Sequence, residues 1–148
     1  IVGGGGKRVL TEAALRADIV GLNASLHAGS VGPETALSAL GERFLERRNW
    51  VEEAAGDRFA DIELQMNTFM TAVTNTTSEA DQMFEGMAPM FGLSPEQART
   101  IPMVLAGTIS DVCDQLHQYR ELYGTSYWVI HEGEVDAMAP VVAKMTDT

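Results

Sequence analysis

The chain has 148 residues, 45% of them hydrophobic, and a formal net charge of −11. This length suits one domain with a hydrophobic core, and the acidic balance argues against nucleic acid and anionic membrane surfaces as partners. No apolar run approaches the roughly 20 residues of a membrane span. The single cysteine excludes an internal disulfide and favours a reducing, cytoplasmic compartment.

A run of four glycines near the start of the chain is its most informative local feature. The order is Ile1-Val2-Gly3-Gly4-Gly5-Gly6-Lys7-Arg8, and a helical pattern of apolar residues follows. A strand that ends in glycine and opens a helix leaves backbone N–H groups free at the positive helix end, which favours a bound phosphate. No Ser, Thr, Asp or Asn stands at the expected N-cap, and Lys7 and Arg8 add positive charge. A flexible glycine loop with two solvated basic residues is the alternative.

Four segments have the composition of β-strands, and a helical pattern follows each of them. The strand-like segments are residues 1–4, 18–23, 61–69 and 126–131. Alternation of strands and helices predicts a parallel sheet. Four such strands fit either an open doubly wound sheet or half of an eight-stranded barrel, whose usual length is about 250 residues.

The helical patterns are longer and clearer than the strand patterns. A long amphipathic helix is expected from Pro33 to about Ala55, and a methionine-lined helical face ends near Gly92. A short helix begins near Ser94, and a capping box at Thr108 starts a helix that Gly124 ends. The last helix is expected over residues 134–145. The segments before Thr108 therefore predict a helical insertion ahead of the third crossover helix.

Polar residues at the expected strand ends are candidates for a site. Asn23 ends the second strand and could bind a cofactor or substrate, or cap its own turn. Gln65 and Asn67 share one strand face and need polar partners, which could be each other or a ligand. His131 closes the fourth strand and is the best acid–base candidate, with helix capping as the alternative. His27, in the loop after Asn23, is expected to be solvated.

Other reactive side chains predict structure rather than chemistry. Cys113 is expected to be a small core residue and His117 a solvated one. The three histidines are too scattered to indicate a metal site. The charged run of residues 42–53, which includes Arg47, predicts a solvated helix face with i,i+4 pairs.

An ordered set of these segments resembles a known family. The glycine run with Val9-Leu10, followed by Ala17-Asp18-Ile19-Val20-Gly21-Leu22-Asn23, resembles the luciferase-like monooxygenase superfamily, most closely its deazaflavin-dependent oxidoreductase branch. Gly107-Thr108, Leu116, Tyr123-Gly124 and residues 126–132 resemble the last helix–strand unit of the same family.

The resemblance implies a fold and a place within it. The family fold is a (β/α)8 TIM-type barrel, so residues 1–148 are expected to be a C-terminal half-barrel, strands five to eight of a larger single domain. The chain has no initiating Met and begins inside a strand-like segment, which also predicts a longer protein. Most of the ring pocket and the proton-handling groups of the family lie in the first half. We therefore expect this part alone to be inactive, with the missing N-terminal half as its partner.

The resemblance also implies a cofactor and a reaction. Family members transfer a hydride between a small organic substrate and coenzyme F-420 (5-deazaflavin), or use FMN in monooxygenases. The cofactor phosphate is expected on Gly3, Gly4, Gly5 and Gly6, with support from Lys7 and Arg8 and a possible contact from Asn23.

One alternative belongs to another class of function. The half-barrel could be a non-catalytic module that is stable only when paired, either with the missing half or as a homo-oligomer, because its edge strands and inner face would otherwise be open.

Overall fold

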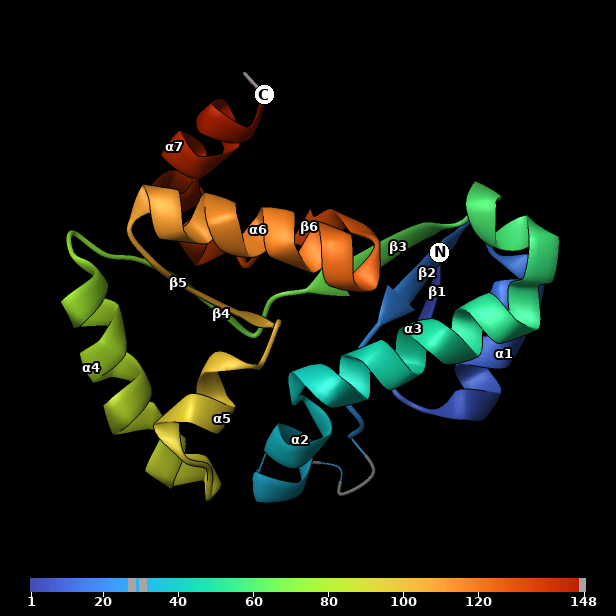
Figure 1. The fold of residues 1–148 in the computed structure, drawn as a ribbon, viewed down its shortest axis with the longest axis horizontal. Helices are drawn as coiled ribbons and strands as arrows, with labels where there is room; N and C mark the ends of the chain where they lie inside the picture. The colour runs from blue at the N-terminus through green and yellow to red at the C-terminus, as the bar shows by residue number, and fades with distance from the viewer. Residues whose placement is uncertain (27–28, 30–31, 147–148) are drawn as a thin grey trace.

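Four parallel strands form the main sheet of the computed structural model, which describes residues 1–26, 29 and 32–146. They lie in the order β1 (Val2–Gly4), β2 (Ile19–Leu22), β3 (Glu63–Asn67) and β6 (Thr125–Val129). Every neighbouring pair in this sheet is parallel (Figure 1). The register places Gly3 beside Gly21 and Gly21 beside Gln65. The predicted parallel quartet of strands is confirmed.

One face of this sheet carries the hydrophobic core. The strand residues Val20, Leu22, Leu64 and Met66 are buried there. They are covered by three helices, α1 (Lys7–Arg16), α3 (Gly41–Ala55) and α6 (Ile109–Tyr123). On β6, Trp128 points to the same side, with its ring 5.9 Å from that of Tyr119 in α6. Strands with helices on one face are the arrangement of a barrel wall.

The opposite face of the sheet has small and polar residues on β1 to β3 and two exposed apolar side chains on β6. Gly3, Gly21 and Gln65 form one row across three strands. Tyr127 and Val129 of β6 expose 38% and 39% of their surface on this face. In a closed barrel this face points to the interior, where a further layer of side chains covers it.

Two further strands form a separate parallel pair and correct the sequence prediction. β4 (Met70–Val73) and β5 (Val104–Gly107) pair in register from Met70 with Val104 to Val73 with Gly107. The sequence predicted one strand over residues 61–69 and only helices before Thr108. Val104–Gly107 is buried throughout, so it shows no alternation that distinguishes a strand from a buried helix. Thr68 and Phe69 separate β3 from β4.

The long helix predicted from Pro33 to Ala55 is divided in two. α2 (Pro33–Ser38) ends at Ala39, and α3 starts at Gly41. A Cβ on Gly41 would lie 2.8 Å from both the Thr100 carbonyl oxygen and the Tyr123 hydroxyl. A tertiary contact that needs a glycine therefore sets the start of α3, and the helical periodicity of the sequence does not record it.

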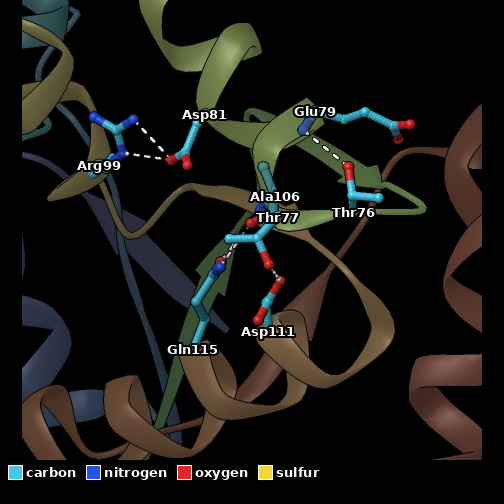
Figure 2. A network of polar contacts seen from close by, with 8 residues as sticks. All are labelled: Thr76, Thr77, Glu79, Asp81, Arg99, Ala106, Asp111 and Gln115. Carbon is cyan, nitrogen blue, oxygen red and sulfur yellow. Dashed lines mark hydrogen bonds and ion pairs between the residues drawn. The ribbon is translucent and has the colours of Figure 1, made fainter.

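The predicted helical insertion is confirmed between β4 and β5. It consists of α4 (Thr77–Met87), the 3-10 turn η2 (Ala88–Phe91) and α5 (Pro95–Arg99). Gly92 ends η2 in the left-handed conformation at φ 67°. Arg99 in α5 donates to Asp81 in α4 at 2.8 Å, and Thr77 donates to Asp111 at the start of α6 at 3.0 Å (Figure 2). The first bond joins two helices of the insertion, and the second joins the insertion to α6.

The chain ends in α7 (Val135–Thr146), which follows the 3-10 turn η3 (Glu132–Glu134). Another 3-10 turn, η1 (Gly56–Asp61), links α3 to β3. Within the residues described, none of the helices has the length and apolar character that crossing a membrane requires.

Candidate functional site

The glycine turn between β1 and α1 presents an uncapped helix end. Gly6 is the N-cap of α1, with φ −116° and ψ 148°, and no side chain of the described residues caps it. The first turn of α1 has no acidic residue. The first intrahelical bond of α1 runs from the Leu10 amide to the Gly6 carbonyl at 3.1 Å. The earlier amides of α1 therefore have no acceptor within the helix, as at any uncapped N-terminus.

The four glycines meet different surroundings. A Cβ on Gly5 would lie 2.6 Å from the Ala24 carbonyl oxygen, so the backbone after β2 requires a glycine there. A Cβ on Gly4 would meet the Val9 side chain at 2.8 Å, and one on Gly3 would meet the Asn23 amide at 3.0 Å. Gly6 has nothing within 4 Å of such a Cβ. Only Gly6 of the four therefore opens onto free space.

The side chain of Arg47 in α3 donates hydrogen bonds to the glycine turn and to the end of α2. Its Nε donates to the Gly5 carbonyl at 3.0 Å and its Nη1 donates to the Ser38 carbonyl at 2.7 Å. The side chain is only 4% exposed, and its guanidinium lies 5.1 Å from the Phe44 ring centroid. Burial lowers the pKa of Arg47 below its ordinary value. The prediction of a solvated position for Arg47 is wrong, because this side chain leaves the charged face and enters the core.

The two basic residues after the turn have different surroundings. Lys7 forms an exposed ion pair with Glu53 of α3 at 3.7 Å. Arg8 is exposed on the first turn of α1. Lys7 therefore contacts α3, whereas Arg8 faces solvent beside the uncapped end.

Three amide side chains form a chain of hydrogen bonds at the carboxyl edge of the sheet. Gln65 donates to Asn67 at 2.7 Å, and Asn67 donates to Asn23 at 3.3 Å. Gln65 is 5% exposed, and a Cβ on the neighbouring Gly21 would lie 2.7 Å from its Oε1. The structure thus brings these three residues together, and the side-chain oxygen of Asn23 accepts from a neighbouring amide.

His131 lies at the same edge, after β6. It is exposed, and its backbone N–H donates to the Glu134 carboxylate at 3.4 Å while its carbonyl accepts from the Glu134 amide at 2.9 Å. Burial favours a raised pKa for Glu134, but hydrogen bonds from Thr71 and His131 outweigh it and lower that pKa. The backbone of His131 therefore has the helix-capping role that was the alternative to chemistry, and its imidazole faces solvent.

An apolar cavity of about 160 Å³ lies beside the glycine turn, between α2, the insertion and the strand ends. Its lining includes Ala24, Ala36, Ala39, Phe69, Phe91 and Met103. Ala24 is also the residue whose backbone lies against Gly5. The cavity therefore adjoins the turn that carries the uncapped helix end.

The remaining sequence candidates fall outside this region. Cys113 is 3% exposed in α6, so its prediction as a core residue is confirmed. His117 is exposed on the same helix, as predicted. His27 lies outside the described residues. Within the described part of the chain, no group of three His, Cys, Asp or Glu side chains is placed to hold a metal ion.

Sequence reasoning missed Arg47 and the apolar cavity. The only signal for Arg47 was its position one residue from Arg48 on a helix, which separates the two side chains by about 100° around the axis. The cavity is assembled from the loop after β2, from α2 and from the insertion, which are far apart in the chain, so no local pattern indicates it.

Comparison with solved structures shows a shared fold. A long-chain alkane monooxygenase superposes with a TM-score of 0.60 over 98% of this chain at 15% identity. A riboflavin lyase solved with modified FMN and riboflavin gives 0.61 over 98% at 11% identity. The chain has the fold of one part of these enzymes. A coenzyme F-420-dependent tetrahydromethanopterin reductase from Methanopyrus kandleri gives 0.51 over 86% at 14% identity.

These likenesses confirm the predicted half of a (β/α)8 barrel. The chain spans 40%, 42% and 43% of the lengths of the three solved proteins. No protein-family model matches the chain, and no curated protein matches it at a significant level.

Proposed function

We propose that this chain is the cofactor-phosphate half of a luciferase-like oxidoreductase barrel that transfers a hydride between a flavin-type cofactor and an organic substrate. The observation that carries the proposal is the uncapped N-terminus of α1 at Gly6, at the carboxyl edge of a parallel sheet. In (β/α)8 barrels, ligands bind at this edge, and phosphates bind at helix N-termini there.

The residues present fit the phosphate of such a cofactor. The free amides of the first turn of α1 are donors, and the absence of acidic residues from this turn leaves the helix dipole unopposed. Arg8 adds an exposed positive charge beside them. In a chain with a net charge of −11, a local positive end of this kind distinguishes the turn from the rest of the surface.

The chain's own residues would bind and orient rather than carry the chemistry. A bound flavin or deazaflavin supplies hydride transfer itself. Gly3 and Gly5 let the turn approach the neighbouring backbone, and Gly4 leaves room for the Val9 side chain. Gly6 with Arg8 would hold the phosphate. The amides of Asn23 and Asn67 would position polar groups at the sheet edge. His131, exposed at the same edge, is the remaining acid–base candidate of this chain.

The sequence resemblance favours coenzyme F-420 (5-deazaflavin), and FMN in a monooxygenase is the alternative. Among the structures with this fold, one is a coenzyme F-420-dependent reductase and another holds modified FMN. Because both cofactors carry a phosphate after the ring side chain, the same turn would serve either. The names of the similar enzymes refer to an alkane, riboflavin and tetrahydromethanopterin, so the substrate does not carry over.

A matched pair of variants at Gly6 tests the proposal. Gly6→Asp adds the missing side-chain cap, so the chain should become more stable by about 0.3 kcal/mol. The same carboxylate would lie where the phosphate is expected to bind and would repel it. The affinity for FMN and coenzyme F-420 should therefore fall by roughly tenfold or more. Gly6→Ala keeps the amides free and should bind both cofactors as the parent does.

The titration uses the 148-residue chain and the complete barrel that contains it. Equal affinity of the parent and Gly6→Asp for both cofactors would contradict phosphate binding at the N-terminus of α1. The ratio of the two affinities in the complete barrel distinguishes the deazaflavin enzyme from the FMN enzyme.

The exposed inner face favours a second candidate function, a paired half-barrel. Tyr127 and Val129 are 38% and 39% exposed on a face that a closed barrel covers. A missing N-terminal half or a second copy of this chain would cover it. Sedimentation of the isolated chain tests this: a cofactor-free dimer supports pairing between copies, and a folded monomer at micromolar concentration contradicts it.

A further inference from the structure

We propose that the apolar cavity beside the glycine turn binds an uncharged aromatic or aliphatic group of the substrate, about the size of one benzene ring. This inference rests on the proposed function, because it gives the cavity a role in the same site. It concerns the substrate class, which the fold likeness does not carry.

The lining of the cavity is almost entirely hydrocarbon. Of the eleven described residues that form it, Thr35 is the one with a polar side chain, and none is charged. Phe69 and Phe91 form an edge-to-face pair on one wall, with ring centroids 6.3 Å apart and planes at 87°. A cavity with such walls gives water too few hydrogen-bond partners, so an apolar group is the favoured occupant.

The size of the cavity limits what can occupy it. Its volume of about 160 Å³ is close to the ~150 Å³ of an engineered apolar cavity that binds benzene. A helix with side chains is about 10 Å across, so no helix of a partner protein fits inside. The occupant is therefore a small molecule or one apolar group of a larger one.

The cavity lies next to the glycine turn where the cofactor phosphate is proposed to bind. Ala24 lines the cavity and lies against Gly5 of the glycine turn. Ala36 and Ala39, at the middle and end of α2, form another wall, and Arg47 joins the Ser38 carbonyl between them to the Gly5 carbonyl. A group in this cavity would thus lie next to a cofactor whose phosphate is held at Gly6.

The absence of charge from the lining predicts selectivity. A carboxylate in the cavity would lose its hydration without gaining a partner, which makes its burial unfavourable. Toluene and benzoate have the same ring and differ in that charge. Toluene should bind, and benzoate should not.

Methyl NMR on the 148-residue chain with 13C-labelled methionine methyl groups tests the proposal without any cofactor. Met87 and Met103 line the cavity, whereas Met66 is fully buried on the helix-covered face of the sheet and serves as an internal reference. Toluene should shift the Met87 and Met103 resonances in a saturable way and leave Met66 unchanged. Benzoate at the same concentration should shift none of them.

Two variants that fill the cavity give a second arm. Ala36→Leu and Ala39→Leu add side chains at the α2 wall and should weaken toluene binding by roughly tenfold or more. Ala143→Leu, at an exposed position on α7, is the matched control and should bind as the parent does. Filling variants are scored only if their melting temperature stays near that of the parent.

Two results would overturn the proposal. One is the absence of toluene shifts at Met87 and Met103 up to the solubility limit, and the other is equal shifts with benzoate. These outcomes are separate from the cofactor test, because no flavin is present in the toluene experiment. If toluene does not bind, the phosphate site at Gly6 can still be correct. If the Gly6 variants do not change cofactor affinity, toluene can still bind the cavity.

Discussion

The Nε atom of Arg47 lies 3.0 Å from the Gly5 carbonyl oxygen, 42 residues earlier in the chain. The same guanidinium reaches the Ser38 carbonyl at 2.7 Å, so one buried cation joins the glycine turn to the end of α2. The turn and the wall of the apolar cavity are therefore held in a fixed relation. Any ligand that occupies both would meet a preformed site rather than two independent loops.

Replacement of Arg47 should destabilise the chain. Arg47→Met leaves the Gly5 and Ser38 carbonyls without their donor, and buried hydrogen bonds to a charged group contribute about 2–3 kcal/mol. Arg43→Met is the control, because Arg43 forms exposed ion pairs with Glu42 and Glu46, and its replacement should cost less than about 1 kcal/mol. Urea unfolding followed by circular dichroism measures both. Equal losses for the two variants would show that the buried bonds contribute little.

Alanine substitutions at Gly5 and Gly6 should have unequal effects. At Gly5 the new Cβ would lie 2.6 Å from the Ala24 carbonyl oxygen, so the backbone must move at a cost of about 1–3 kcal/mol. At Gly6 the Cβ meets nothing within 4 Å, so the cost comes only from the poorer N-cap preference of alanine and should be about 0.5–1 kcal/mol. Thermal unfolding of the pair gives the comparison. A tolerated Gly5→Ala would contradict the close packing of the turn on the loop after β2.

The Gln115 side chain in α6 hydrogen-bonds to the edge of β5 that does not pair with β4. Its removal should expose that edge. Its side chain accepts from the Ala106 amide at 3.3 Å and donates to the Ala106 carbonyl at 2.7 Å (Figure 2). In Gln115→Ala both groups lose their partner, so exchange of the Ala106 amide with solvent deuterium should accelerate at least roughly tenfold. Gln118→Ala, at an exposed position on the same helix, should leave that amide unchanged. Unchanged exchange in Gln115→Ala would mean that the strand edge is protected in another way.

The capping carboxylate of α6 should make stability depend on pH. The pKa of Asp111 lies below its ordinary value of 3.8, because it accepts from the Thr108 backbone and side chain and from Thr77. A lowered folded-state pKa gives a contribution that is present above pH 3.8 and is lost as the pH falls through the folded value. Asp111→Asn should therefore be less stable than the parent at pH 7, and this difference should shrink below pH 3.8. A difference that stays constant from pH 7 to pH 2 would contradict this origin.

The parts of the fold that were predicted from sequence have local causes. The strands of the main sheet and the capped helices are each specified by residues within the element or next to it. Examples are the Thr108 capping box and Gly124 at the two ends of α6. Residues whose surroundings come from distant segments were not predicted. Gly41 starts α3 because of Thr100 and Tyr123, and Val104–Gly107 is a strand because Met70–Val73 lies beside it.

The same distinction holds for the candidate site. The glycine turn and the polar strand ends were predicted because each lies in one short segment. Gln65, Asn67 and Asn23 come together as expected from parallel strands that end at one edge. Arg47 was assigned to the solvated face because its neighbours Glu46 and Arg48 are charged, and its carbonyl partners lie 42 and 9 residues away.

Backbone amide NMR of Lys7, Arg8 and Val9 during titration with FMN and with riboflavin tests the phosphate seat most directly. The two ligands share the ring and differ in the phosphate. If the first turn of α1 holds that phosphate, these three amides should shift with FMN and stay in place with riboflavin. Equal shifts with both ligands, or shifts with neither, would contradict the account.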